Sequence, residues 1–468
     1  MEQMQLDILL VNPPLCSDAS GKPTAPENIG LTCGVMPPIQ LVKLATMLRR
    51  NGHSVKVLDL AILASKNNIL QLFQELLSRI HVRYVGFSNH SVINLGAIEK
   101  LASIAKNRGA IVLIGGINPT HMQGEIFQYV PSADVVFVGF AEKTLMDYVQ
   151  NKTISKGVIT KQTAIVPQNL RDLAQHNADV NSALSTLDNA GALDLSLLLF
   201  LKEYVKAGCI YPIETQRGCE FSCNFCVSKM LLGSAPARRK LESVLEELEL
   251  AIAFGFSEFF FTDNTFTGNR EYAEKLCKAM IELKTKKKTK NILCMTRVDA
   301  VDAELLQLMA SAGFTGIGFG VETVGEVQLL GKGLNRQKNL EKTKGIFSQA
   351  RALGIEPTAF LMVGSPFDTE QTLTATLAFF KKAFSEGWLR EGFVTISKFI
   401  PVPGSIYYYY SEKFGIEKFT KEKFQNAWFF SGPAVTSTRN LSLDKVSEWH
   451  SRFKRELQVG VPLFELVG

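Results

Sequence analysis

The chain has 468 residues, of which 46% are hydrophobic and 21% are charged, so it is long enough for two or three globular domains. Its net charge of +6 is small for this length and gives little support for a nucleic acid partner. Eight cysteines are too sparse for the disulfide framework of a small secreted domain, the first residues form no signal peptide, and no apolar stretch could span a bilayer. We expect a cytoplasmic protein without a membrane partner.

The first 152 residues alternate short apolar runs with segments of helical periodicity. The apolar runs predict buried strands, and they cover residues 8–14, 55–59, 84–88, 111–116 and 135–139. Helices are predicted between them at residues 39–50, 69–80 and 97–108. This alternation predicts an α/β domain with a doubly wound, Rossmann-like parallel sheet, which binds ligands at the carboxyl ends of its strands.

Polar residues and glycines follow these strands, at the edge where a ligand is expected. The candidate contacts are Asn12, Ser88, Gly115 and Gly116. A glycine pair lets a bulky ligand approach the backbone, although such a pair is also common in plain turns. His90 and His121 could approach the same ligand, and the alternative is that each is simply hydrogen-bonded within the fold.

Residues 153–206 are weakly patterned and are interpreted as a connector. From residue 207 to 400 the alternation returns, with strands predicted at 211–215, 258–263, 292–297, 316–322, 359–364 and 394–399. Their carboxyl ends carry Asp263, Arg297, Glu322, Gly364 and Lys398. Such ends converge on one mouth in a (β/α) barrel, so the pattern predicts a partial barrel with a site there. The lysine-rich run at 284–290 is predicted to be a solvated loop, with an RNA-binding patch as the alternative.

Cys219, Cys223 and Cys226 form a Cys-x3-Cys-x2-Cys triplet after the first barrel strand, with Phe225 before the last cysteine. Three thiolates this close together can bind one soft metal centre. A cubane cluster held by three cysteines leaves one iron open to a small chelating molecule, whereas an electron-transfer cluster normally has a fourth thiolate. Cys209 lies ten residues upstream of Cys219, so a closed cluster or a zinc site is the alternative.

At these positions the sequence resembles the radical S-adenosylmethionine (SAM) superfamily, whose defining motif is this triplet with an aromatic residue before the third cysteine. The resemblance implies that the three cysteines hold a 4Fe-4S cluster and that SAM chelates the open iron. One electron, from a donor such as flavodoxin or ferredoxin, would then cleave SAM to methionine and a 5'-deoxyadenosyl radical. The implied SAM contacts are Phe225, Asp263, Arg297, Glu322 and Gly364. An ion pair between Arg297 and Glu322 is the alternative for those two residues.

The N-terminal region resembles the cobalamin-binding-type domain that precedes the radical domain in one branch of the superfamily. The matching features are Asn12-Pro13-Pro14, the segment 52–55, Gly115-Gly116, and Val138-Gly139 followed by Glu142. The Asp-x-His-x-x-Gly pattern that supplies a histidine to cobalt is absent after the first strand, and residues 121–124 reproduce only its last four positions, after a different strand. Many members without this histidine still bind cobalamin, so the resemblance implies cobalamin contacts at Asn12, Ser88, Gly115 and Gly116.

Residues 401–468 form a C-terminal region with the aromatic runs 407–410 and 428–430 and a predicted helix at 442–457. The tyrosines could line a substrate pocket, but packing between domains is the favoured interpretation. The leading hypothesis for the whole chain is a radical SAM enzyme that carries out cobalamin-dependent methylation of an unactivated carbon of a small metabolite. The alternatives are a radical dehydratase, epimerase or rearrangement enzyme without methyl transfer, and a closed-cluster or zinc-binding interaction protein.

Overall fold

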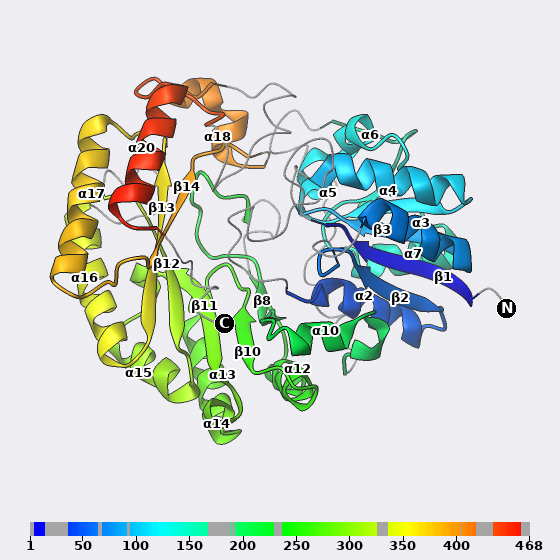
Figure 1. Cartoon of the computed structure of the whole chain (residues 1–468), viewed down its shortest axis with the longest axis horizontal. Helices are drawn as coiled ribbons and strands as arrows, with labels where there is room; N and C mark the ends of the chain where they lie inside the picture. Colours follow the sequence, from blue (N-terminus) through cyan, green and yellow to red (C-terminus); the bar gives the residue numbers. More distant parts are fainter. Residues whose placement is uncertain are drawn as a thin grey trace.

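The computed structural model describes residues 4–14, 36–63, 68–90, 94–166, 188, 192–228, 236–324, 336–402, 404–417 and 434–459. Two α/β domains lie side by side, each built around its own six-stranded sheet (Figure 1). The predicted fold class, a Rossmann-like domain followed by a partial barrel, is confirmed. Within the described residues no helix is long and apolar enough to cross a membrane.

The first sheet has the strand order β2-β1-β3-β4-β5-β6. Its strands are β1 (Met4–Asn12), β2 (Val55–Asp59), β3 (Ile80–Ser88), β4 (Ile111–Gly115), β5 (Val135–Phe137) and β6 (Val158–Thr160). The first five are parallel, as predicted. The sixth, β6, is an antiparallel edge strand from the segment that was interpreted as a connector only. In the parallel part, Ser88 pairs with Gly115, which brings two predicted contacts to one edge.

Helices cover both faces of this sheet (Figure 1). They are α2 (Ile39–Arg50), α3 (Ile69–Arg79), α4 (Leu95–Asn107), α5 (Ile117–Met122), α6 (Ile126–Tyr129) and α7 (Glu142–Asn151). Alternate residues of β1 point to opposite faces, so Leu9 and Val11 join the core that contains α3 and α4, while Ile8 and Leu10 join the core that contains α2 and α7. This second core continues into the barrel domain, and the two domains are therefore packed together on that side.

The second sheet has the order β14-β13-β12-β11-β10-β7, with every neighbouring pair parallel. Its strands are β7 (Tyr211–Ile213), β10 (Glu258–Phe261), β11 (Asn291–Arg297), β12 (Gly316–Glu322), β13 (Glu356–Val363) and β14 (Val394–Lys398). The surrounding helices are α10 (Leu201–Lys206), α12 (Leu241–Ala253), α13 (Arg270–Glu282), α14 (Thr285–Lys288), α15 (Ala303–Ala312), α16 (Arg336–Ala352) and α17 (Glu370–Ser385). Helix α14 corrects the loop predicted for the lysine-rich run, because the backbone makes one short helical turn there.

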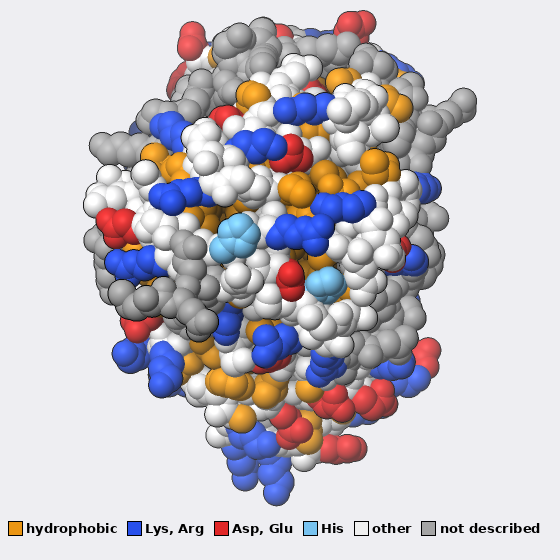
Figure 2. Space-filling view, turned by 90° about the vertical axis from the view of Figure 1, so that its right-hand side faces the viewer, with side chains coloured by type: hydrophobic (Ala, Val, Ile, Leu, Met, Phe, Trp, Pro, Cys, Tyr) orange, Lys and Arg blue, Asp and Glu red, His pale blue; other side chains and the backbone are white. Residues whose placement is uncertain are grey.

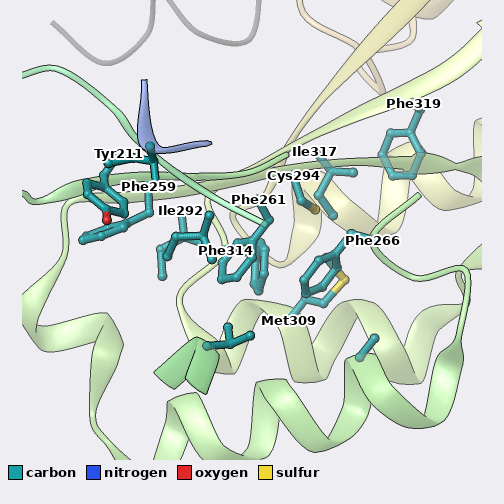
Figure 3. Packing of buried hydrophobic residues seen from close by; sticks show 14 of the residues in the cluster. Tyr211, Phe259, Phe261, Phe266, Ile292, Cys294, Met309, Phe314, Ile317 and Phe319 are labelled. Carbon is teal, nitrogen blue, oxygen red and sulfur yellow. The ribbon is translucent and has the colours of Figure 1, made fainter. Parts of the chain in front are cut away.

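Alternation along the central strands separates the face that packs against the helices from the face that lines the barrel interior. Figure 3 shows Phe259, Phe261, Ile292, Cys294, Ile317 and Phe319 from β10, β11 and β12, packed with Phe266, Met309 and Phe314. Side chains of a strand alternate in direction, so Gly316, Gly318 and Gly320 of β12 face the opposite, concave side. Three glycines on one face leave that side of β12 without side chains, and this makes room for a ligand inside the partial barrel.

The C-terminal region packs against the end of the barrel sheet. Helix α20 (Leu443–Glu456) confirms the predicted helix and buries Val446, Trp449 and Phe453 against the barrel core. In α18 (Ile406–Tyr409), Tyr407 is fully buried, whereas Tyr410 just beyond the helix is 50% exposed. The favoured packing interpretation is thus confirmed for Tyr407, and the aromatic run 428–430 lies outside the described residues.

Charged side chains are spread over the surface. In the face shown in Figure 2, lysine and arginine side chains extend from top to bottom with acidic side chains among them. This distribution agrees with the small net charge of the chain.

Candidate functional site

The segment that leads into the cysteine loop is held by Asp263, just after β10. Oδ1 of Asp263 accepts hydrogen bonds from the backbone N–H groups of Thr215 (2.9 Å) and Gln216 (3.0 Å), and Oδ2 accepts one from the Thr215 hydroxyl (2.6 Å). Burial raises the pKa of this carboxyl group to about 6, although the hydrogen bonds oppose the rise. Because both oxygens accept hydrogen bonds from the chain, the structure gives Asp263 a positioning role, and its predicted contact with SAM is not tested.

The three cysteines of the triplet each have a polar neighbour. The sulfur of Cys219 lies 3.4 Å from the Thr265 hydroxyl, and the sulfur of Cys226 lies 3.2 Å from the Ser228 hydroxyl and 3.4 Å from the Ser228 backbone N–H. The sulfur of Cys223 accepts a contact from Nη1 of Arg297 at 3.5 Å. Polar groups of this kind are suitable neighbours for the sulfur ligands of a metal cluster.

Cys209, the possible fourth ligand, lies at the wrong end of β7. It precedes the amino end of this strand, whereas Cys219 follows the carboxyl end, and burial raises the pKa of its thiol to about 11. Across the described residues no three His, Cys, Asp or Glu side chains come close enough together to hold a single metal ion. A cubane has its irons at separate corners, so its three thiolates need not meet at one point.

Arg297 lies at the end of β11, beside the cysteine loop. Its partner is Asp299, which accepts hydrogen bonds from Nε at 2.7 Å and from Nη2 at 2.5 Å, and its guanidinium lies 3.9 Å from the ring centroid of Phe221. Burial disfavours the charged form, but Asp299, Cys223 and Glu322 together raise the pKa of Arg297. Arg297 thus lies beside Cys223, and its contact with SAM stays a prediction; no local pattern marks Asp299 as its partner.

Glu322 ends β12 next to an irregularity in the pairing of β12 with β13. Its φ of 63° lies in the left-handed region, which a residue with a side chain adopts at a cost of about 1–3 kcal/mol. Such strain at the end of the glycine-lined strand supports a functional role for Glu322. Its contact with SAM stays a prediction.

Phe225, before the third cysteine, is part of an aromatic cluster behind the loop. This cluster contains the buried Phe399 and Tyr407, and the backbone N–H of Tyr407 donates to the carbonyl oxygen of Asn224 at 3.3 Å. The C-terminal region thereby supports the cysteine loop. The predicted SAM contact of Phe225 is not tested by this packing.

Gly364 and Lys398 have roles that the sequence did not reveal. A Cβ atom on Gly364, where φ is +90°, would lie 2.9 Å from both methyl groups of Val446, so the absent side chain allows α20 to pack. This close approach explains the glycine, and its predicted contact with SAM is not tested. Lys398 is buried, and burial together with Lys454 of α20 lowers its pKa to about 8, so it faces neither solvent nor the mouth.

A cavity of about 420 Å³ lies between the two domains. From the first domain, its wall includes Ser88, Gly115 and Gly116, three of the four predicted contacts. Asn12 lies behind this wall, where it accepts a hydrogen bond from the Ser88 hydroxyl (3.1 Å) and donates to Asp59 (2.9 Å). Asn12 therefore supports the site from outside the lining.

The opposite wall of the cavity comes from the second domain and was missed by sequence reasoning. It contains Glu214, Gln216, Arg217, Val227, Ser228, Thr262 and Asn264, several of which flank the cysteines. No local pattern marks these residues as ligand contacts, because only the docking of the domains brings them opposite Gly115 and Gly116. The cavity thus places the predicted ligand edge of the first domain directly against the cysteine loop of the second.

Buried ion pairs join the two walls. Arg217 contacts Glu142 of α7 at 2.6 Å and Glu214 at 2.9 Å, and its guanidinium lies 4.2 Å from the ring centroid of Phe140. Burial would raise the pKa of Glu214, but Arg217 and then Lys43 of α2 outweigh it and lower this pKa to about 2. The domain interface is therefore fixed by charges that are taken out of water, not only by apolar packing.

The cavity fits a corrinoid. Its lining is mostly apolar, which suits the broad faces of a corrin ring, and Asn264 offers an amide group to the amide rim. A Cβ atom on Gly116, where φ is +118°, would lie 2.6 Å from the carbonyl oxygen of Asn89, so only glycine allows this wall to close. The cysteine triplet with its polar neighbours likewise fits an iron–sulfur cluster.

Two family models match this chain. The radical SAM superfamily matches residues 213–380, and the B12 binding domain matches residues 31–149. The chain therefore contains a radical SAM domain preceded by a B12-binding domain. As a radical SAM enzyme it uses a 4Fe-4S cluster and SAM, and its B12-binding domain adds cobalamin.

Relatives of this radical SAM enzyme include methyltransferases. An uncharacterized methyltransferase of Pyrococcus horikoshii is 27% identical over 81% of this chain and 78% of its own length. Cytidylyl-2-hydroxyethylphosphonate methyltransferase of Streptomyces wedmorensis is 24% identical over 70% of this chain and 69% of its own. The fold is similar to that of the methyltransferase TsrM from Kitasatospora setae with cobalamin and a cluster bound, with a TM-score of 0.71, 19% identity, and coverage of 89% of this chain and 77% of that one.

Proposed function

We propose that this radical SAM enzyme transfers a methyl group from SAM to an unactivated carbon of a small-molecule substrate, with cobalamin as the methyl carrier. The observation that carries the proposal is the cavity shared by the two domains: Gly115 and Gly116 of the B12-binding domain and Ser228 of the cysteine loop line the same space. A methyl carrier in one domain and a radical source in the other would face each other there. The methyltransferases among the relatives support methyl transfer over a radical reaction without it.

The chain's own residues bind and orient the reacting groups. The cluster and SAM, when bound, supply a 5'-deoxyadenosyl radical that abstracts hydrogen, and cobalamin supplies the methyl group. Arg297, beside Cys223, offers a cation to the SAM carboxylate, and Glu322 offers a carboxylate to its ammonium group. The glycine face of β12, which ends at Glu322, leaves the neighbouring part of the barrel interior without side chains and so offers room for SAM.

Two further parts of the proposal concern the cell. The electron would come from a small redox protein such as flavodoxin or ferredoxin, because the cluster must be reduced before it cleaves SAM. The cytoplasm is the proposed location, since it keeps an oxygen-sensitive cluster and free thiols reduced.

The test uses the anaerobically purified protein, reconstituted with iron, sulfide and cobalamin and reduced with dithionite. SAM with a deuterated methyl group is added together with a small-molecule extract of the source cells. Methyl transfer predicts 5'-deoxyadenosine and S-adenosylhomocysteine in comparable amounts and a product that carries the deuterated methyl group. Cys223→Ala is the matched control and should form no 5'-deoxyadenosine. Formation of 5'-deoxyadenosine without S-adenosylhomocysteine would show a radical enzyme that does not methylate.

A further inference from the structure

His90 lies at the ligand edge of the first domain, two residues after the end of β3. It lines the cavity together with Ser88, Gly115 and Gly116. The backbone on which it stands is fixed: the N–H of Asn89 donates to the carbonyl oxygen of Gly115 (2.8 Å), and the carbonyl oxygen of Asn89 accepts from the N–H of Asn118 (3.3 Å). The loop that carries His90 is thus held against the glycine pair.

The side chain of His90 has the chemistry of a metal ligand. Among the described residues that line the cavity, it is the one with an imidazole, and none has a thiol or thioether. The two carboxylates of the lining, Glu142 and Glu214, are already engaged by Arg217. Imidazole nitrogen is a good donor to cobalt, whereas amides and hydroxyls are weak ones.

The exposure and the protonation state of the His90 imidazole also suit a metal ligand. The side chain keeps an exposed surface, as expected of a residue on the wall of a cavity that is open to a ligand. Burial lowers the pKa of His90, so the ring is neutral at physiological pH and has a free lone pair. A neutral ring is the form that binds a metal.

The structure separates His90 from His121, the other histidine considered from the sequence. His121 is buried and is not part of the described cavity lining. Its ring packs against Gly404, where a Cβ atom would lie 3.2 Å from the ring. Neither ring nitrogen has a hydrogen-bond partner among the described residues. His121 is therefore a buried histidine of similar chemistry in the wrong place, which makes it a suitable control.

We infer that His90 supplies an axial nitrogen ligand to the cobalt of bound cobalamin. The inference rests on the proposed role of cobalamin and goes beyond it, because it replaces the missing histidine after the first strand with one after β3. His90 follows a different strand of the same sheet, so the Asp-x-His-x-x-Gly motif is not needed to give cobalt a histidine ligand.

The test is the electron spin resonance spectrum of the cobalt(II) form. Protein is labelled uniformly with nitrogen-15 and loaded anaerobically with unlabelled cobalamin, which is then reduced to cobalt(II). His90 ligation predicts that each high-field cobalt line is split in two, as a spin-½ nitrogen requires. The splitting should disappear in His90→Ala and persist in His121→Leu.

Three results would overturn the inference. Lines split in three would identify the unlabelled benzimidazole of cobalamin as the ligand, and lines without nitrogen splitting would show that no nitrogen binds. A splitting in two that persists in His90→Ala would identify another protein nitrogen. The outcome for the proposed function is separate: S-adenosylhomocysteine from the unlabelled wild-type protein reports methyl transfer whichever ligand is found. If the wild-type protein binds no cobalamin at all, the inference and the proposed function both fail.

Discussion

The buried ion pairs between the domains allow a sharp contrast between two substitutions, Arg217→Met and Lys43→Met. Both side chains are nearly inaccessible, with exposed fractions of 3% and 1%, and methionine replaces much of the apolar volume of each. The two substitutions differ in whether the acidic partners of the replaced side chain keep another cation. The prediction is that the first substitution is strongly destabilising and that the second is not.

Arg217 has two partners that depend on it. Its guanidinium is 2.6 Å from Glu142 and donates to both oxygens of Glu214 at 2.9 and 3.0 Å. In Arg217→Met both carboxylates stay buried and Glu142 loses its cation. Removal of one partner from a buried ion pair costs about 3–5 kcal/mol, so we expect a loss of this size.

Lys43 is different because its partners have other cations. Its Nζ lies 3.7 Å from Glu214 and 3.6 Å from Glu247 and makes no hydrogen bond within the described part of the chain. Glu214 keeps Arg217, and Glu247 keeps a 2.6 Å contact with Arg239. Burial lowers the pKa of Lys43, which shows that its charge is penalised more than it is stabilised. Lys43→Met should therefore be neutral or stabilising.

The assay is urea denaturation of the anaerobic apoprotein, followed by tryptophan fluorescence and circular dichroism. We expect the midpoint of Lys43→Met to equal or exceed that of the wild type and the midpoint of Arg217→Met to fall well below it. Because Arg217 joins the domains, its removal should also separate the two signals into distinct transitions. Equal losses in the two variants, or a wild-type midpoint for Arg217→Met, would refute the reasoning.

Three further substitutions test single sites. Asp263→Asn should retain the cluster, because the amide oxygen can accept from both backbone N–H groups and the amide nitrogen can donate to the Thr215 hydroxyl oxygen. Asp263→Ala should lose the cluster, because it leaves two buried N–H groups unpaired at about 1–3 kcal/mol each; iron analysis measures this, and equal loss in both would point to a need for the charge itself. Gly116→Ala should lose bound cobalamin, which is measured by its absorbance. Gly109→Ala is the control and should retain cobalamin, because Gly109 also has a positive φ (+82°) but no atom within 4 Å of the added Cβ; equal retention in both variants would contradict the close approach at Gly116. Gly364→Ala should destabilise the protein by about 1–3 kcal/mol. In the double variant Gly364→Ala/Val446→Ala, the denaturation midpoint should fall by less than the two single-variant decreases added together; strict additivity would rule out the contact.

The sequence by itself determined the fold class, and it carries the prediction of the cluster ligands. Local hydrophobic periodicity predicts the alternation of strands and helices. Cys219, Cys223 and Cys226 are close in space because they are close in the chain. The same holds for the glycine pair after β4, whose place at the ligand edge follows from the parallel sheet alone.

Only the tertiary structure decided which polar residues contact each other. Asp263 and Gly364 stand at strand ends, as predicted, but their neighbours are Thr215 and Val446, which lie far away in the sequence. The cavity between the domains was likewise hidden, because the contact that fixes it joins Glu142 to Arg217, 75 positions apart in the chain (217 − 142). Hydrophobic periodicity predicts which face of a helix or strand is buried. Contacts between residues of different domains depend on how the two domain surfaces dock, and the short-range sequence pattern contains no information about this docking.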